Sequence, residues 1–578
     1  MGSRSRASRA KAGPERLAVR GSSRTFWVMA AFGLIVAVFV MRLLYLDVIV
    51  AHEYSTQAKA ARTIGITVEA KRGTIYDRNH NVLAISVDAT TIYANPSEVD
   101  DPRGTAAKIA DAIGGEADDY VDKLLDARRQ FAYIKRKVDP AVAQSLRDQN
   151  LKGVYFLRDS KRSYPYGQVG GQIVGACNEE VNTETQTEYL KGIAGLEYYY
   201  DKQLSGTPGY YEAERGADGT PIPGGVHESV PAQNGEDIIV SLDIEMQRAL
   251  EEKLTSGLAA VGTNSGTAVL MDGGTGEIYA AASLPLFNPA DRTTVEEGST
   301  QLKAVSNLLE PGSVFKTVAA MSLLETGSMG PEDTLFAPAV ISADGYKVSD
   351  AHERGDTVYS LRQVMQYSSN VGIALAVERM GFKPFYDHIL KYKLNELSGV
   401  DYPGEQSGYL LDYDKWSRVA GYNATFGQGL SMTPLQITRF YAALVNDGSA
   451  PTPHFLLRSS GDEAPREWKQ TQVVENTDAI APMTSMLETV VTDGTGKRAA
   501  VEGVKVAGKT STAEIYDEVN GGYLKGVYNL CFAGYLPDSS SRLVCFVGAD
   551  RVPFDSGVTF IFRDIMSEAV NRYNIVPE

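Results

Sequence analysis

The stretch LLEPGSVFKTVAAMSLLETG, residues 308–327, places a turn directly before an apolar helix. Pro311 and Gly312 predict the turn, and Gly327 predicts the end of the helix. Between them, apolar side chains recur three or four residues apart: Val314, Val318, Met321 and Leu324. The pattern predicts a helix whose first turn carries the sequence Ser-x-x-Lys.

Ser313 is expected at the start of this helix, with Lys316 one turn further along on nearly the same face. A serine hydroxyl near the positive end of a helix, beside an amine that burial can keep neutral, is the arrangement of a nucleophile and its base. The pattern also occurs without meaning at Ser8–Lys11. On this motif alone, a capping serine followed by a surface lysine is the simpler interpretation.

Two further polar motifs follow in the chain. Ser368 and Asn370 lie between two helical patterns in LRQVMQYSSNVGIALAVERMG (361–381), so a hydroxyl and an amide can project from a turn into a cleft. A plain polar turn would have the same sequence. The third motif, Lys-Thr-Ser-Thr at 509–512, lies in VEGVKVAGKTSTAEIYD (501–517). Valine and threonine alternate there, which predicts a strand.

Residues 503–510 also satisfy the phosphate-loop pattern Gly-x-x-x-x-Gly-Lys-Thr. A phosphate loop wraps backbone amides around an anion and continues into a helix. Here the alternation predicts a strand and no helical pattern follows. Nucleotide binding is therefore not expected.

The charge distribution separates a short tail from the rest of the 578-residue chain. Residues 1–25 have a net charge of +6, and the remaining residues have −22. An acidic body argues against nucleic acid as a partner. The composition, 43% hydrophobic and 22% charged, is that of a globular protein.

The tail precedes an apolar segment, residues 26–46. At about 1.5 Å per residue, this segment spans roughly 31 Å, enough to cross a bilayer with Arg42 at the interface. A cleaved secretory signal is the alternative, but the segment is long for one and a small-residue cleavage site is poor. Positive residues remain on the cytoplasmic side, so we expect a single-pass membrane protein with residues 1–25 inside and the catalytic part outside.

The rest of the chain is expected to form two domains, 47–236 and 237–578, separated by a Gly- and Pro-rich stretch at 216–236. The first domain opens with a hairpin at 71–96 and continues with helical periodicity over 104–150. The second begins with a helix that Asp243 caps and that runs through Leu254, continues with a hairpin, 267–272 and 277–283, and ends with strands and a helix. Strands at both ends with helices between them predict a mixed α/β domain.

Three cysteines, Cys177, Cys531 and Cys545, are too few for a disulfide scaffold. Cys531 and Cys545 lie on two apolar runs joined by a turn-like segment and could face each other across a hairpin. We interpret them as unbonded core thiols rather than a disulfide, although the sequence leaves the bond open.

Three motifs in this order, about 55 and 140 residues apart, are jointly specific. The sequence resembles the class B penicillin-binding proteins, monofunctional D,D-transpeptidases that cross-link peptidoglycan. The resemblance extends to RGTIYDRN (72–79), YPYGQVGGQIVG (164–175), GIAGLEYYYDKQLSG (192–206), FNP (287–289) and FGQGLSMTPLQ (426–436). It implies an α/β fold with a membrane anchor, an elongated α+β pedestal domain, and a transpeptidase domain with a five-stranded sheet flanked by helices.

The resemblance also implies the catalytic roles. Ser313 is the nucleophile that attacks the D-Ala-D-Ala carbonyl of a donor stem peptide, and Lys316 is its general base. Ser368 transfers a proton, and Asn370 orients the substrate amide. An amine from a neighbouring strand then resolves the acyl-enzyme, with no metal or organic cofactor.

The motif at 509–512 supplies substrate binding in the same family. Lys509 and Thr510 bind the terminal carboxylate, and the backbone N–H groups of Ser313 and Thr512 form the oxyanion hole. At Ser511 the family has glycine, so this chain adds a Cβ and a hydroxyl at the site. We expect Ser511 to narrow the site and to slow acylation by bulky β-lactams.

The implied partners are peptidoglycan stem peptides, β-lactams as covalent inhibitors, the membrane, a glycosyltransferase and other division proteins. No histidine pair has the spacing of a zinc peptidase, and His352 is expected to be structural. A septal role is favoured over an elongation role. A β-lactamase or carboxypeptidase, and a catalytically weak scaffold or antibiotic sensor, are the other functions that the sequence allows.

Overall fold

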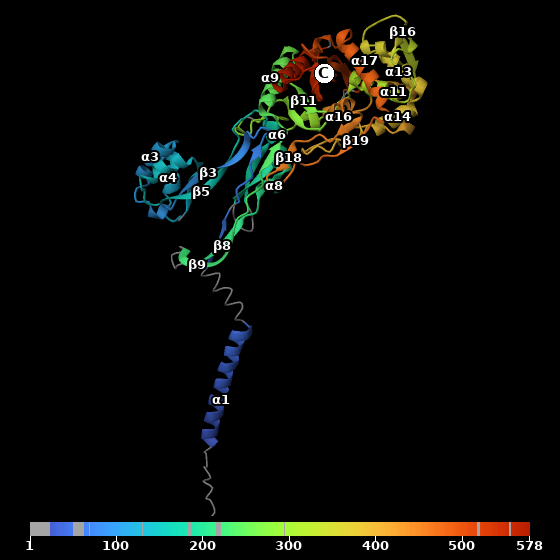
Figure 1. The fold of residues 1–578 in the computed structure, drawn as a ribbon. Helices are drawn as coiled ribbons and strands as arrows, with labels where there is room; N and C mark the ends of the chain where they lie inside the picture. The colour runs from blue at the N-terminus through green and yellow to red at the C-terminus, as the bar shows by residue number, and fades with distance from the viewer. Residues whose placement is uncertain are drawn as a thin grey trace, which may run out of the picture. The chain divides into compact units, whose positions relative to one another are not determined.

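A computed structural model describes residues 23–49, 63–68, 70–129, 131–181, 188–215, 221–293, 295–516, 521–553 and 557–577. Their contacts define two compact units (Figure 1). The first comprises Met1–Val68 and Gly209–Pro231, and the second comprises Glu69–Pro208 and Ala232–Glu578.

The first unit contains the apolar helix α1, Ser23–Leu44, which continues into a π-helical turn, Tyr45–Ile49. Among the described residues, the segment Arg24–Asp47 is the one helix long and apolar enough to cross a membrane, and its side chains are exposed. This agrees with the predicted anchor at 26–46. The sequence also predicts a helix over about residues 50–70; residues 50–62 lie outside the described residues, and residues 63–68 form a strand instead.

The same unit contains a three-stranded antiparallel sheet in the order β1-β8-β9. Its strands are β1 (Thr63–Val68), β8 (Gly209–Arg215) and β9 (Pro221–Val230). The prediction of an irregular linker at 216–236 is therefore wrong for β9. Its prolines are tolerated because β9 is an edge strand and Pro221 is its first residue, so missing N–H groups cost few sheet hydrogen bonds.

The second unit begins with the predicted hairpin. Strands β2 (Ile75–Tyr76) and β3 (Val82–Ala94) pair antiparallel around a turn in which Asp77 accepts hydrogen bonds from the backbone N–H groups of Asn79 and Asn81. Strand β3 also pairs with β4 (Ala132–Val138) and β5 (Val154–Ser163).

Helices α3 (Pro102–Ile113), α4 (Ala117–Leu124) and α5 (Pro140–Arg147) pack on this sheet around Ile92 and Ile134. The predicted helical periodicity over 104–150 holds for these three helices but is wrong for β4. The segment AYIKRKV is polar and short, and its pairing with β3 decides its conformation.

A buried ion cluster joins the strands to the following helices. The Glu197 carboxylate in α7 (Gly195–Tyr199) is completely buried and contacts Arg72 Nε at 2.6 Å and Arg162 Nε at 2.7 Å. Arg72 also contacts Asp201, at the start of α8 (Asp201–Ser205). The hairpin and these helices are thereby held together, since breaking one partner of a buried pair leaves an uncompensated charge.

The main sheet has five strands, the number that the family resemblance implies, and they are antiparallel in the order β12-β11-β22-β21-β20. The strands are β11 (Gly266–Asp272), β12 (Ile278–Leu284), β20 (Ala507–Tyr516), β21 (Tyr523–Tyr535) and β22 (Leu543–Val552). Distant segments therefore build one sheet, because the first and last parts of the domain contribute adjacent strands.

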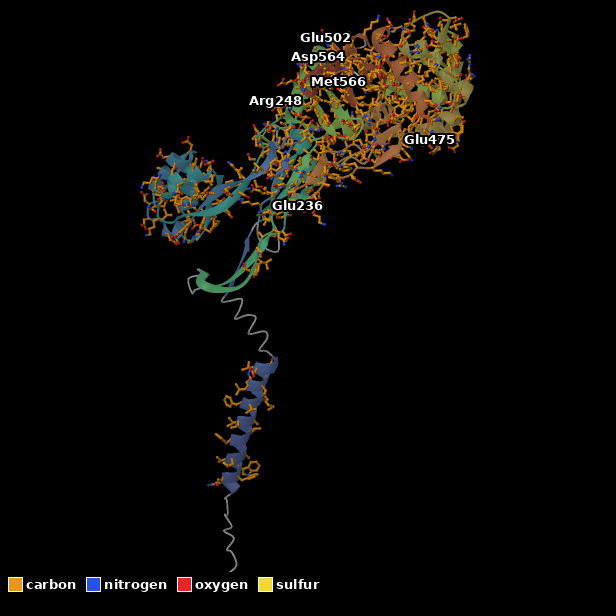
Figure 2. The ribbon with its side chains drawn as sticks, viewed as in Figure 1. Glu236, Arg248, Glu475, Glu502, Asp564 and Met566 are labelled. Carbon is orange, nitrogen blue, oxygen red and sulfur yellow. The ribbon has the colours of Figure 1, made fainter. Side chains whose placement is uncertain are left out.

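Helices cover both faces of this sheet. One face packs on α9 (Ile244–Ala260) and α18 (Thr559–Tyr573). Met566 of α18 is buried in this packing, whereas Asp564 is partly exposed; both residues are labelled in Figure 2. The other face packs on α11 (Lys316–Glu325), α16 (Pro434–Val445) and α17 (Ile480–Thr492). Figure 1 shows α9 and α16 on opposite sides of β11.

Shorter elements complete the helical side and the connections. They are α6 (Gly171–Val174), β6 (Ala176–Val181), β7 (Glu188–Ala194), β10 (Ile238–Val240), α10 (Lys303–Ser306), β13 (Thr334–Ala337), β14 (Val340–Ala343), β15 (Tyr346–Ser349), β16 (Thr357–Ser360), α12 (Leu361–Gln366), α13 (Asn370–Met380), α14 (Phe382–Lys391), α15 (Arg418–Thr425), β17 (Ser449–Pro451), β18 (Leu456–Ser459) and β19 (Gln470–Gln472).

The three cysteines are free and buried, as predicted. Cys531 and Cys545 do not face each other, however, because Cys531 pairs with Gly548 and Cys545 with Gly534. The register offsets the cysteines by three residues, and side chains alternate between faces, so the two thiols lie on opposite sides of the sheet.

Candidate active site

A cleft of about 740 Å³ lies between the edge strand β20 and the helical side of the main sheet. Its lining includes six of the residues singled out from the sequence: Ser313, Ser368, Asn370, Thr510, Ser511 and Thr512. The two lysines of the motifs, Lys316 and Lys509, are completely buried beneath it. The structure thus brings all three motifs together.

Ser313 lies in a 3-10 turn, Gly312–Phe315, that leads directly into α11. Gly312 has a φ of +57°, and a Cβ there would come within 2.4 Å of Ser511 Oγ, so this turn requires glycine. The tight turn precedes the α-helix that the sequence predicts to begin at Ser313. It leaves Ser313 half-buried at the cleft, with its Oγ 3.0 Å from Lys316 Nζ.

Lys316 is the first residue of α11, a helix whose residues 316–323 are all buried. Its Nζ donates to the Ser368 carbonyl at 2.6 Å and also lies 3.0 Å from Ser368 Oγ. Burial, reinforced by the nearby charge of Lys509, holds the pKa of Lys316 well below its usual value of 10.5. A neutral amine with one N–H fixed on a carbonyl keeps a lone pair that can accept a proton from a neighbouring hydroxyl.

Ser368 connects the two lysines. It lies between α12 and α13 with a φ of +59°, a conformation that non-glycine residues rarely adopt. This backbone turns both its carbonyl and its hydroxyl toward Lys316, and Lys509 Nζ donates to the same hydroxyl at 2.9 Å. The Ser368 hydroxyl can therefore pass a proton between neighbours.

Asn370 is the first residue of α13 and lines the cleft. Its Nδ2 donates to the carbonyl of Ser349 at 3.0 Å. This bond fixes the orientation of the side-chain amide, so that Asn370 can present its polar group to a substrate in one direction.

Strand β20 carries the third motif with the predicted alternation. Lys509 and Ser511 are buried on one face, whereas Thr510 is half-buried and Thr512 is exposed on the other. Burial lowers the pKa of Lys509 to about 7. Because β20 is the edge of the sheet, backbone groups on its outer side are free to pair with an extended ligand.

In the phosphate-loop pattern at 503–510, residues 503–506 form a turn and a short loop, but residues 507–510 already belong to β20, which continues to Tyr516 where a phosphate loop would enter a helix. Lys509 lies within a strand, its side chain is fully buried, and its Nζ contacts Ser368 Oγ and the Thr510 carbonyl. Residues 503–510 therefore do not have the geometry of a phosphate loop.

Ser511, the position at which the sequence departs from the family motif, joins β20 to the turn that carries Ser313. Its Oγ donates to the carbonyl of Pro311 at 2.8 Å, and its side chain is only 4% exposed. Ser511 therefore contributes to the floor of the cleft, with its hydroxyl directed at the turn.

Several residues around the cleft were not singled out from the sequence. Asp350 and Arg354 line it from the loop after β15. Thr495 also lines it, and the hydroxyl oxygens of Thr495 and Thr510 form a hydrogen bond of 2.6 Å. Arg498 lines the same end. No local motif marks these residues, because only the tertiary fold brings them to the cleft. His352, which was named from the sequence and expected to be structural, also lines the cleft and is exposed.

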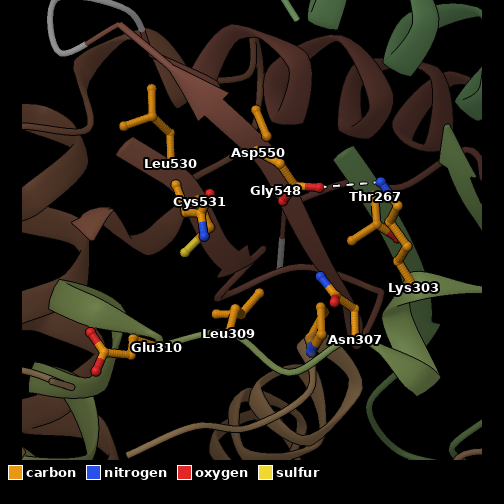
Figure 3. A pocket seen from close by; sticks show the side chains of 12 residues that line it. Thr267, Lys303, Asn307, Leu309, Glu310, Leu530, Cys531, Gly548 and Asp550 are labelled. Carbon is orange, nitrogen blue, oxygen red and sulfur yellow. Dashed lines mark hydrogen bonds and ion pairs between the residues drawn. The ribbon is translucent and has the colours of Figure 1, made fainter. Parts of the chain in front are cut away.

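A second cavity, of only about 10 Å³, is lined by residues of β21 and β22 together with Thr267 and Lys303 (Figure 3). Lys303 and Asp550 form an ion pair across it at 3.2 Å, and Lys303 Nζ also contacts Ser265 Oγ. The space is about that of a single water molecule, so it does not compete with the cleft as a substrate site.

Comparisons with known proteins place both parts of the chain in one family. Residues 266–567 match the model of the penicillin-binding protein transpeptidase domain, and residues 67–240 match that of the penicillin-binding protein dimerisation domain. Together, the matches cover most of the second unit.

Individual relatives agree with these matches. Penicillin-binding protein PbpB of Mycobacterium tuberculosis is 31% identical over 91% of this chain and 82% of its own length. Peptidoglycan D,D-transpeptidase FtsI of Escherichia coli is 27% identical over 88% of this chain and 85% of its own.

A solved structure shows the same similarity in three dimensions. Penicillin-binding protein 3 of Mycobacterium tuberculosis, complexed with aztreonam, is 27% identical, with a TM-score of 0.67 over 89% of this chain and 98% of that chain. The motifs, the five-stranded sheet and these matches agree, and the chain belongs to the class B penicillin-binding proteins.

Proposed function

We propose that this protein is a peptidoglycan D,D-transpeptidase that cross-links stem peptides through an acyl-enzyme on Ser313, in septal wall synthesis. The observation that carries the proposal is the unbroken series of contacts from Ser313 Oγ to Lys316 Nζ, to Ser368 Oγ, and to Lys509 Nζ, each of 3.0 Å or less. The relatives named peptidoglycan D,D-transpeptidase support the reaction.

In the acylation step, Ser313 Oγ attacks the carbonyl carbon of the penultimate D-alanine of a donor peptide. Neutral Lys316 accepts the hydroxyl proton. The C–N bond to the terminal D-alanine breaks, and that amine leaves with a proton delivered through the Ser368 hydroxyl. The donor is then an ester on Ser313, and the energy of the broken amide is retained in this ester.

Binding of the donor uses the edge of the sheet. We place the terminal carboxylate near Thr510 and Lys509, the side-chain amide of Asn370 on the peptide, and the carbonyl oxygen between the N–H groups of Ser313 and Thr512. An edge strand suits this task because an extended peptide can add to it through backbone hydrogen bonds. Ser511 supports the arrangement from below through its bond to Pro311.

In the second step, the amine of a neighbouring stem peptide attacks the ester carbonyl. Neutral Lys316 accepts the proton that this amine releases and returns it to the Ser313 oxygen as the C–O bond breaks, so the serine hydroxyl is restored and a new amide joins the two strands. A β-lactam acylates the same serine, but its opened ring remains attached in place of the departed D-alanine. These inhibitors are therefore expected ligands, as for the relative crystallised with aztreonam.

The proposed organisation assigns a task to each part of the chain. Residues 1–25 form a cytoplasmic tail, 26–46 a membrane anchor, 47–236 a pedestal and 237–578 the transpeptidase domain. The pedestal is the expected contact for a glycosyltransferase and other division proteins, which supply and position the glycan strands. A septal role is supported by similarity to FtsI of Escherichia coli and to stage V sporulation protein D of Bacillus subtilis.

Replacing Ser313 by alanine is expected to abolish covalent labelling by a fluorescent penicillin while the protein stays folded, because the substitution removes the nucleophile and little else. Peptide mapping of the labelled wild type should place the label on Ser313. The matched control is Ser8→Ala, which changes the other Ser-x-x-Lys sequence and should leave labelling unchanged. Labelling of another serine would contradict the assignment.

Acylation is expected to depend on pH through Lys316. The neutral amine is the active form, so the rate should fall as the pH decreases through the pKa of Lys316, at a midpoint well below 10.5. Lys316→Arg should slow acylation by about 100-fold or more, because arginine stays charged. The measurement is the acylation rate from pH 5.5 to 10.5.

The control for this series is Lys505→Arg, since Lys505 is an exposed lysine paired with Asp538 near the start of β20. It should reproduce the wild-type profile. A midpoint at the ordinary lysine value, or full activity of Lys316→Arg, would show that another group is the base.

Ser511→Gly is expected to raise the acylation rate for a bulky β-lactam more than for a small one, because it removes the Cβ and hydroxyl between β20 and the Ser313 turn. Ser511→Ala separates the two effects, since it removes the hydrogen bond to Pro311 but keeps the Cβ. If both variants are acylated more slowly than the wild type, to the same extent by the bulky and the small β-lactam, the serine supports the turn and does not restrict the cleft.

The proposed topology follows from the positive tail before the apolar segment. Protease added outside intact spheroplasts should digest nearly all of the chain beyond residue 47. Residues 1–25 should become accessible only after permeabilisation. Protection of the region after residue 237 in intact spheroplasts would rule out both this orientation and a role in wall synthesis.

A further inference from the structure

The carboxylate of Asp350, in the loop after β15, contacts the turn that carries Ser368. It accepts hydrogen bonds from Ser369 Oγ, at 3.0 and 2.8 Å to its two oxygens, and from the backbone N–H of Val371 at 3.0 Å. The Asp350 side chain is only 11% exposed. It is therefore a built part of the cleft wall rather than a surface charge.

These bonds complete the start of α13. Ser369 is the N-cap residue, and its Oγ accepts the N–H of Gly372 at 3.0 Å while donating to Asp350. Asp350 satisfies a second N–H of the first helical turn, at Val371, and places a negative charge at the positive end of the helix. The adjacent Ser349 carbonyl binds Asn370 Nδ2, so two consecutive residues hold the turn.

Arg354 fixes the carboxylate in turn. Its Nε contacts Asp350 Oδ2 at 2.6 Å, and one of its terminal nitrogens donates to the carbonyls of Ala337 and Gly355 at 2.9 Å. The Arg354 side chain is 15% exposed. Because the guanidinium is planar and bonded at both ends, it holds the Asp350 carboxylate in one orientation.

Ser368, the residue next to the Ser369 that Asp350 binds, has an unfavourable backbone conformation. A left-handed conformation is unfavourable for a non-glycine residue, and Ser368 has a φ of +59°. Surrounding bonds must therefore hold it. If Ser368 relaxed to an ordinary conformation, its carbonyl and hydroxyl could no longer both reach Lys316 Nζ, as they do now at 2.6 and 3.0 Å.

We propose that Asp350 is a positioning residue for the acylation reaction: through Ser369 and Val371 it holds Ser368 in the conformation that contacts Lys316. Arg354 orients Asp350 for this task. The inference rests on the proposed acylation of Ser313 and adds two residues that never touch the reacting atoms. The sequence motif itself contains only one of the partners, Ser369.

The charge of Asp350 also predicts a specific change in the pH dependence of acylation. The charged groups that act on Lys316 are Lys509, from β20, and Asp350, from the loop after β15. Asp350 raises the pKa of Lys316, opposing burial and Lys509. Replacing it with asparagine should therefore lower that pKa further and move the acid limb of the acylation profile to lower pH.

The test measures β-lactam acylation by the full chain in detergent, for the wild type, Asp350→Asn, Ser369→Ala and the double variant. Asp350→Asn is expected to lower the acylation rate at saturating β-lactam at least 10-fold, with a smaller effect on initial binding, and to shift the acid limb to lower pH. Ser369→Ala should slow acylation without that shift. The double variant should be no slower than the slower single variant, because both substitutions disrupt the same contact between Asp350 and Ser369.

The matched control is Asp356→Asn, in the same loop, whose exposed carboxylate accepts the backbone N–H of Ala339, outside the start of α13. It should acylate like the wild type. Wild-type rates and an unshifted profile for Asp350→Asn, or effects that multiply in the double variant, would overturn the positioning role. If Asp350→Asn does not fold, an unimpaired Ser369→Ala would overturn it. An unlabelled wild type would instead contradict the proposed function.

Discussion

Two lysine side chains, Lys316 and Lys509, are completely buried beneath one cleft, and the surrounding structure is built to accommodate them. A buried ammonium is costly, so burial lowers the pKa of both lysines, and the charge of Lys509 lowers the pKa of Lys316 further. Their polar hydrogens still need acceptors. Ser368 provides a carbonyl and a hydroxyl, and the Thr510 carbonyl provides another. The same contacts that satisfy the amines connect them to the Ser313 hydroxyl.

This constraint explains why segments far apart in sequence meet with little tolerance. The Ser313 turn approaches β20 so closely that Gly312 cannot carry a Cβ, and Ser511 bonds directly to its backbone. On the other side, Ser368 keeps a left-handed backbone, and Asp350 holds the neighbouring Ser369 and Val371. The sheet contributes an edge strand, which leaves backbone groups available to an extended peptide. Acyl transfer to a peptide requires both features: catalytic side chains held rigidly on one side of the cleft, and an open strand edge on the other that can bind the peptide.

Local pattern predicted the elements well where one face of a segment is buried. The helix beginning near Ser313, the hairpin at 71–96 and the last helix all agree with the structure. The five strands of the main sheet were implied by the family resemblance, and they also agree. The predictions from local sequence pattern were wrong where the pairing of β-strands overrides local conformational preference. Strand β9 forms in a stretch rich in glycine and proline, β4 interrupts a helical pattern, and strand register separates Cys531 from Cys545. A strand is stabilised by its neighbour, and the neighbour is distant in sequence.

The sequence by itself determined which chemical groups the site has. Ser313, Lys316, Ser368, Asn370 and Lys509 could be named from spacing and family resemblance, because short-range helical and strand periodicity fixes which side chains share a face. Only the tertiary structure decided what state those groups are in. Burial lowers the pKa values of the lysines, and the fold brings Asp350, Arg354 and Thr495 to the cleft from loops that no motif marks. Desolvation and long-range contact depend on everything packed around a residue, which no local stretch of sequence contains.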